Sequence, residues 1–130
     1  MLAAFLLIAI GSGNAQEAGV SSRAEAGAAV FKKCRACHQI GPDARNGIGP
    51  VLNGVVGRPA GQYPGYNYSS ANKTSGLVWD EQTLARYLRA PRDVVPGTKM
   101  IFLGLKKNQE VADVIAYLKR FDNKGNLVKP

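Results

Sequence analysis

The five residues from Cys34 to His38, which read Cys-Arg-Ala-Cys-His, combine the residue types and the spacing of a covalent cofactor site. They hold both cysteines and the single histidine of the chain. A C-x-x-C-H run is the attachment pattern of a c-type haem, in which two thioethers fix the porphyrin and the imidazole ligates its iron. The run therefore predicts one covalently attached haem c, held by Cys34 and Cys37, with His38 as an axial metal ligand.

The opposite face of the iron needs a second ligand, and the chain has two methionines, Met1 and Met100. Met1 begins an apolar leader that we expect to be removed, so Met100 is the thioether left to the mature chain. Histidine and methionine together ligate the iron of haem proteins that carry electrons. Because neither bond has to form or break, such an iron changes oxidation state with little rearrangement. The pair His38 and Met100 favours a one-electron carrier over an enzyme.

Other sites can be built from the same run. A Cys34–Cys37 disulfide would close too short a loop to stabilise much, and a thiol redox centre would lack the thioredoxin-like βαβ pattern. A zinc site would have three ligands and would need a carboxylate as the fourth. A haem-based enzyme or small-ligand sensor would need an open iron, and therefore a displaceable Met100.

The beginning of the chain predicts export. Residues Leu2 to Ile10 are continuously apolar, and Gly13-Asn14-Ala15 supplies the small residues that a signal peptidase reads. We expect a cleavable signal peptide over residues 1–15, a single domain over residues 16–130, and a periplasmic location. The apolar run is too short to span a bilayer, so no stable membrane insertion is expected.

The charge of the chain points to acidic partners. A formal net charge of +8 at pH 7 suggests that the surface attracts an acidic protein. Nucleic acid is not expected as a partner, because the chain shows no recognised binding motif.

Three helices are predicted from local signals, and they give an all-α fold class. The capping box from Ser22 to Glu25 predicts a helix that runs to about Cys34, and Gly27 within it suggests a close approach by another backbone. Asp80 is predicted to cap a second helix and Asn108 a third, each with an apolar stripe at helical spacing.

Apart from a short helical turn predicted over Ser69 to Asn72, the rest of the chain is predicted to be irregular. Glycine and proline recur through residues 39–62, where no helix or strand period survives. A loop of that length is unusual in a compact domain unless it packs on a large apolar cofactor. Residues 122–130 are polar and are predicted to fray.

Several short motifs, taken in order, carry a family resemblance. They are Gly49-Pro50, Gly57-Arg58, Pro64-Gly65-Tyr66, Tyr68, Ala71-Asn72-Lys73, Trp79 and the run from Pro96 to Phe102. With them the chain resembles class I cytochrome c, close to the mitochondrial protein and to soluble bacterial relatives of the c2 type. The resemblance implies a small cytochrome c fold, in which N- and C-terminal helices pack together around a covalently bound haem with long loops.

The resemblance also assigns roles beside the two axial ligands. It implies that the carbonyl of Pro50 accepts the other imidazole N–H of His38, which would fix the ring and its basicity. It places Tyr87 and Thr98 near the sulfur of Met100.

At the propionate end of the haem, the resemblance implies hydrogen bonds from Arg58, Tyr68 and Trp79, because a buried anion needs donors. Asn72 would help to order water beside the propionate. Asn46 stands where mitochondrial relatives commonly have a histidine that ties two loops, so we expect that tie to be made differently.

The same resemblance implies a docking surface and its partners. It places five basic side chains around the exposed haem edge: Lys33, Arg92, Lys99, Lys106 and Lys107. The implied partners of the monomer are acidic redox proteins, such as a cytochrome bc1-type complex, an oxidase, a photosynthetic reaction centre or a periplasmic dehydrogenase.

Overall fold

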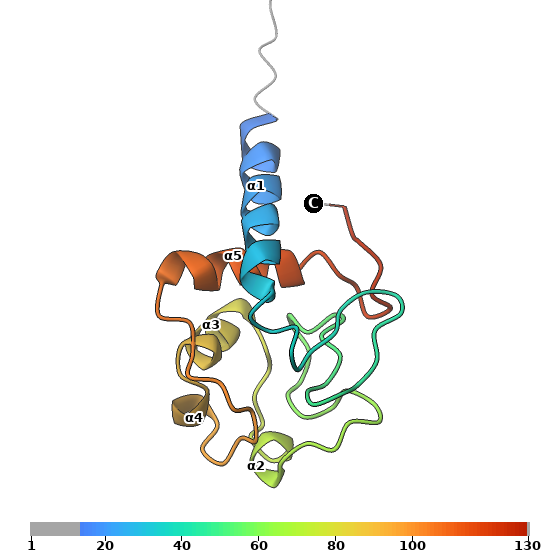
Figure 1. Ribbon diagram of the computed structural model, residues 1–130, viewed down its shortest axis with the longest axis vertical. Helices are drawn as coiled ribbons and strands as arrows, with labels where there is room; N and C mark the ends of the chain where they lie inside the picture. The colour runs from blue at the N-terminus through green and yellow to red at the C-terminus, as the bar shows by residue number, and fades with distance from the viewer. Residues whose placement is uncertain (1–13, 130) are drawn as a thin grey trace, which may run out of the picture.

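The computed structural model describes residues 14–129, which form helices joined by long loops (Figure 1). The helices are, in chain order, α1 (Asn14–Phe31), α2 (Ser70–Lys73), α3 (Glu81–Arg89), α4 (Pro91–Val94) and α5 (Asn108–Leu118). Within the described part of the chain, β pairing is limited to two isolated bridges, Pro59 with Val78 and Phe121 with Leu127. The all-α prediction is confirmed.

Helix α1 begins earlier than the capping box predicts. It starts at Asn14 and runs through Ser22, and its first half projects beyond the body of the molecule (Figure 1). The prediction of a start at Ser22 is wrong. The alanine, glutamine and glutamate residues before it favour a helix, and a serine inside a helix lowers its stability by only about 0.5 kcal/mol. Of the predicted signal peptide, residues 1–13 lie outside the described residues, and Asn14 and Ala15 form the first turn of α1.

Helix α5 lies across the second half of α1, at Gly27 (Figure 1). A Cβ at Gly27 would collide with the carbonyl oxygen of Asp113 and would lie 2.7 Å from the Cβ of Tyr117. The predicted close approach of another backbone is therefore confirmed. Phe31 then packs on Tyr117 with ring centroids 5.2 Å apart, which fixes the end of α1 where the Cys34–His38 run begins.

Helix α3 positions the segment that carries Met100. Asp80 caps the helix as predicted, since its Oδ1 accepts a hydrogen bond from the amide of Thr83 at 2.8 Å. The amide of Leu105 donates to the carbonyl of Leu88 at 2.8 Å, and this bond holds the chain after Met100 against the end of α3. At α5 the predicted cap is one residue off, because Asn108 is the first helical residue and Lys107 occupies the cap position.

The segment after α5 folds back and does not fray. Oδ1 of Asp122 accepts the amides of Lys124 and Asn126, each at 2.9 Å, which closes a turn of the kind that aspartate favours. The amide of Val128 then donates to the carbonyl of Arg120 at 2.8 Å. The prediction of a frayed tail is wrong over residues 122–128, because a side-chain cap and backbone pairing outweigh the polar composition.

Within residues 14–129, no helix combines the length and the apolar character that crossing a membrane requires.

Candidate cofactor site

A cavity of about 390 Å³ lies between the end of α1, the loop around residues 48–58, α3 and the segment around Met100. Much of its wall is apolar, with side chains such as Leu52, Val55 and Leu84. All the residues predicted to bind the cofactor line this one cavity: Cys34, Cys37, His38, Pro50, Arg58, Tyr68, Asn72, Trp79, Tyr87, Thr98 and Met100. The structure thus brings together residues that lie far apart in the sequence.

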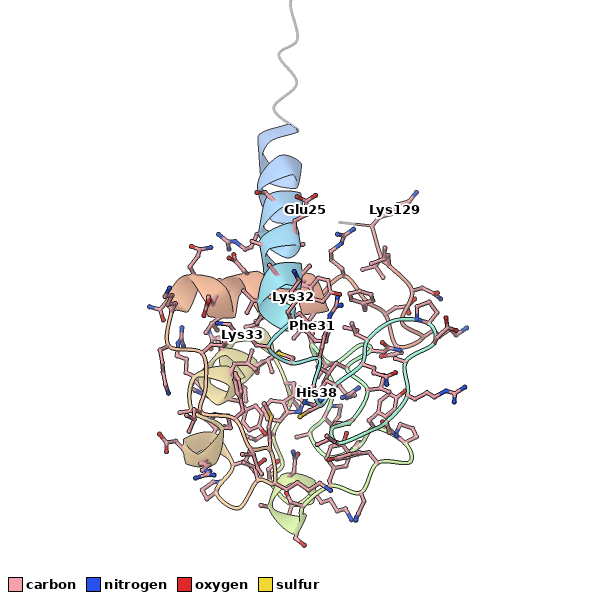
Figure 2. The ribbon with its side chains drawn as sticks, viewed as in Figure 1. Glu25, Phe31, Lys32, Lys33, His38 and Lys129 are labelled. Carbon is pink, nitrogen blue, oxygen red and sulfur yellow. The ribbon has the colours of Figure 1, made fainter. Side chains whose placement is uncertain are left out.

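The Cys34–His38 run forms a turn directly after α1, and His38 lies in the middle of the body (Figure 2). The amide of His38 donates to the carbonyl of Cys34 at 2.9 Å, so both cysteines and the histidine reach the cavity from one short segment. Cys34 and Cys37 are not joined by a disulfide. Burial raises the pKa of the Cys34 thiol, with Cys37 adding to the shift and Lys33 opposing it.

The imidazole of His38 is held in one orientation by its neighbours. Nδ1 lies 2.8 Å from the carbonyl oxygen of Pro50, and because a carbonyl only accepts, the ring proton is on Nδ1. This leaves Nε2 with its lone pair, as a metal ligand requires. Burial lowers the pKa of His38, the Pro50 bond opposes the shift and Arg58 adds to it. The neutral, ligating form is thereby favoured.

Gly49 lies directly against the His38 ring. A Cβ at this position would collide with Cε1 and would stand 2.7 Å from Nδ1 and 2.9 Å from Nε2. A side chain of any size would displace the imidazole, so glycine is required here by contact and not by backbone conformation.

Tyr87, Thr98 and Met100 form a connected group on the other side of the site. The hydroxyl of Tyr87 lies 3.0 Å from Oγ1 of Thr98 and donates to Sδ of Met100 at 3.4 Å. The amide of Met100 donates to the same Thr98 oxygen at 3.3 Å. Burial raises the pKa of Tyr87, while the Thr98 hydrogen bond opposes the shift, so the phenol stays protonated and remains a donor to the sulfur.

At the polar end of the cavity, Arg58 is half-buried and donates to two backbone carbonyls, those of Asn53 at 2.9 Å and Val51 at 3.3 Å. Two of its five N–H groups are used in this way. Among the described residues no carboxylate pairs with Arg58, and burial lowers the pKa of its guanidinium. A half-buried cation that lacks an anion suits a cofactor that carries carboxylates.

The cavity is also lined by three further predicted residues, Tyr68, Trp79 and Asn72. The hydroxyl of Tyr68 accepts the amide of Tyr63 at 3.1 Å, and Trp79 packs on Tyr87 with ring centroids 4.6 Å apart. Oδ1 of Asn72 is buried with no hydrogen-bond partner. A buried polar atom without a partner is costly, so this oxygen indicates a polar group or water that belongs to the loaded site. The donors, the apolar wall and this acceptor fit a haem.

Three of the five predicted docking cations are engaged within the chain. Lys33, close to the end of α1, pairs with Glu110 at 3.0 Å (Figure 2). Nζ of Lys106 donates to the carbonyls of Arg89 and Leu103, at 2.9 and 2.8 Å. Lys99 donates to the carbonyl of Asn67.

The other two predicted docking residues, Arg92 and Lys107, are exposed, and no side-chain bond to the described residues is recorded for either. Of the five, Lys33 and Lys99 line the cavity itself.

Two residues near the site were given no role from the sequence. Asn46 connects two loops through its side-chain amide, where mitochondrial relatives commonly use a histidine. Its Nδ2 donates to the carbonyl of Pro64 at 3.0 Å, and its Oδ1 accepts a hydrogen bond from the amide of Val51 at 2.9 Å. An amide carries both a donor and an acceptor, and that chemistry was the signal for this role. Tyr66 lies in a motif that was recognised, and its hydroxyl donates to the carbonyl of Ile48 at 2.6 Å.

The chain is also similar to known proteins. The profile of the family described as Cytochrome c matches residues 24–122. Cytochrome c2 from Rhodomicrobium vannielii is 62% identical over 92 residues, which cover 71% of this chain and 74% of that protein.

Two solved structures are also similar. Cytochrome cH from Methylobacterium extorquens has a TM-score of 0.70 and 48% identity, and the match covers 74% of this chain and 96% of that one. Cytochrome c2 from Rhodospirillum centenum has a TM-score of 0.73 and 42% identity, with coverage of 76% and 98%.

Proposed function

The chain belongs to the cytochrome c family, and from that membership we propose that it shuttles single electrons between membrane or periplasmic redox complexes through a His38/Met100-ligated haem. Like its relatives it is an electron carrier with a covalently attached haem c, and not an enzyme. When bound, the haem supplies the one-electron Fe(II)/Fe(III) couple.

The observation that carries the proposal is that His38 and Met100 line one cavity, each with its own hydrogen-bonded support. Cys34 and Cys37 would form the thioethers, His38 would ligate through Nε2, and Met100 through its sulfur. Because Pro50 holds the imidazole and Tyr87 holds the thioether, both ligands are positioned before any electron arrives. Little rearrangement is then needed on electron transfer, and the soft sulfur together with burial favours Fe(II).

The proposed location is the periplasm, reached through a signal peptide over residues 1–15. The proposed partners are acidic redox proteins, such as a bc1-type complex, an oxidase, a photosynthetic reaction centre or a periplasmic dehydrogenase. A formal net charge of +8 supports this choice.

The proposed contact surface surrounds the mouth of the cavity. Lys33 and Lys99 line the cavity, and so do Ile48 and Ile101, which are 76% and 89% exposed. Exposed apolar side chains beside cations suit a short-lived contact that is guided by charge and completed by apolar burial.

Carbon monoxide binding to the reduced holoprotein tests the ligation, because this ligand needs an open iron. Met100→Ala should keep its haem and bind carbon monoxide far faster than the parent, by at least about a hundredfold, since several kcal/mol of competing ligation are removed and about 1.4 kcal/mol corresponds to tenfold. Leu103→Ala is the matched control: it removes an 86% exposed side chain from the same segment that does not line the cavity.

The control should bind at the slow rate of the parent. If the parent itself binds as fast as Met100→Ala, the iron is open, the ligation is wrong, and a haem-based enzyme or small-ligand sensor with a displaced methionine is the better description.

A further inference from the structure

Arg58 is a half-buried cation in the wall of the cavity. Two of its N–H groups donate to the carbonyls of Asn53 and Val51, at 2.9 and 3.3 Å. No carboxylate of the described residues pairs with it. The charge of Arg58 is therefore left to act on what the cavity holds, and the strength of that effect depends on how much water reaches the guanidinium.

The ring of Tyr63 covers the guanidinium of Arg58. The Cζ of Arg58 stands 4.9 Å from the centre of this ring, within the range of a cation–π contact. Tyr63 is half-buried and does not line the cavity, so it contacts Arg58 from outside the cofactor site. A guanidinium is planar and more weakly hydrated than an ammonium. It can therefore exchange water for an aromatic ring on one face and keep its N–H groups for acceptors.

Tyr63 makes a second contact with the lining of the cavity, through its backbone. Its amide donates to the hydroxyl of Tyr68 at 3.1 Å, and Tyr68 lines the cavity. Because that oxygen accepts a hydrogen bond, the phenol keeps its own proton for a different acceptor. Burial raises the pKa of Tyr68, with the Tyr63 amide and Arg58 opposing the shift. Tyr63 thus contacts two residues, Arg58 and Tyr68, that are expected to bind a haem propionate.

We propose that Tyr63 is a positioning residue for Arg58, and that its ring keeps water from the guanidinium and thereby raises the reduction potential of the bound haem. The proposal rests on the proposed function as an electron carrier, with Arg58 beside a haem propionate. A cation near the iron disfavours the additional positive charge of Fe(III), and water weakens that effect. Water also stabilises Fe(III) directly, because it solvates the more highly charged state better. Both effects have the same sign, so removal of the ring should lower the potential.

The test is a redox titration of the holoprotein that carries Tyr63→Ala. This substitution removes the ring but retains the backbone amide, and with it the bond to Tyr68. We expect the equilibrium constant for reduction to fall roughly threefold, which is about 28 mV at about 59 mV per tenfold for one electron. Tyr63→Phe keeps a ring over Arg58, so it should retain the potential of the parent.

The shielding itself can be measured by NMR on the reduced holoprotein, as the exchange of the Arg58 side-chain N–H protons with solvent. Tyr63→Ala should accelerate this exchange by roughly fivefold or more, and Tyr63→Phe should leave it unchanged. Phe121→Ala is the matched control, because Phe121 is also a half-buried ring but does not line the cavity and packs on Tyr117, with ring centroids 5.2 Å apart. The control should lower the free energy of unfolding and leave the potential and the exchange unchanged.

A double-mutant cycle shows whether Tyr63 acts through Arg58. Arg58→Met removes the charge and should lower the potential by more than Tyr63→Ala does. In the Arg58→Met background there is no cation to shield, so adding Tyr63→Ala should then have at most about half of its effect in the parent.

The outcomes are distinct. A lower potential and faster exchange in Tyr63→Ala, both absent in Tyr63→Phe, support the proposal. An unchanged potential in Tyr63→Ala overturns it, while a parent with a reversible one-electron couple leaves the carrier function intact. An equal fall of the potential in Phe121→Ala would mean general loosening, and an undiminished effect of Tyr63→Ala in the Arg58→Met background would mean a route that does not involve Arg58; either result overturns the proposal. A parent without a reversible one-electron couple would instead overturn the carrier function.

Discussion

The contact between Gly49 and His38 gives a sharp prediction for the substitution Gly49→Ala. The added methyl group would meet Cε1, Nδ1 and Nε2 of the ring, all at 2.9 Å or less. Ordinary contacts between carbon atoms are about 3.5–4.0 Å, so the imidazole or the loop has to move by roughly 1 Å. Nδ1, one of the three ring atoms that the methyl group would meet, is hydrogen-bonded to the Pro50 carbonyl at 2.8 Å, so a shift of the ring strains that bond.

Three contributions set the expected change in the free energy of unfolding. Overpacking of a well-filled site costs about 1–3 kcal/mol. Loss of the hydrogen bond to Pro50 costs about 1 kcal/mol more. Alanine also restricts the unfolded chain, which stabilises the folded state by about 0.4–1 kcal/mol. This gain applies because the backbone at Gly49 is not in the left-handed region. We expect Gly49→Ala to lower the free energy of unfolding by about 2 kcal/mol.

Gly47→Ala is the matched control two residues away. The nearest atom to a Cβ at Gly47 is the carbonyl oxygen of Cys37, at 4.0 Å, and this glycine also lies outside the left-handed region. The control should leave stability unchanged or raise it by up to about 1 kcal/mol.

Denaturant titration of both holoproteins measures the difference, and a redox titration adds a second readout. The Pro50 bond makes the imidazole more basic and favours Fe(III), so its loss should raise the reduction potential of Gly49→Ala. Equal stabilities and equal potentials for the two variants would refute the argument, because they would mean that the ring does not occupy the position described.

Two further predictions concern the surface and the helix crossing. Steering by charge acts over roughly one Debye length, about 10 Å at 0.1 M salt and 3 Å at 1 M, so oxidation of the reduced holoprotein by ferricyanide should slow as salt rises. Lys33→Glu, at the cavity, should slow that reaction more than Lys129→Glu does. Equal effects of the two variants would mean that net charge, and not the position of the charge, sets the rate. At the crossing, Gly27→Ala should lower the unfolding free energy by about 1–3 kcal/mol despite its better helix propensity, because α5 would have to move; a rise in stability on denaturant titration would contradict the observed crossing.

The chemistry of the site was readable from the sequence because its decisive part is contiguous. Cys34, Cys37 and His38 lie within five residues, so their spacing alone predicts which groups the cofactor meets. The cap at Asp80 was equally local, since its partner is the amide of Thr83. Gly27 was informative because a glycine inside a helix is costly and therefore has a packing reason.

The start of α1 and the fold of the tail were not readable in this way. A capping box at Ser22 states only that a helix can begin there, and the chain before it is equally able to be helical. The polar composition around Asp122 predicted a frayed end. The backbone hydrogen bond from the amide of Val128 to the carbonyl of Arg120 could not be predicted from composition, because any residue can make it.

The contacts between the loops beside His38 and Met100 were decided by the tertiary structure. Tyr66 reaches Ile48 across 18 residues of sequence, and Lys99 reaches Asn67 across 32. The acceptors of both are backbone carbonyls, which every residue possesses, so no residue type reveals them. The sequence by itself determined which side chains could bind a haem and its iron. Only the paths of the loops decided which carbonyls stand opposite Tyr66 and Lys99, because loop paths follow from the packing of the whole chain and not from local preference.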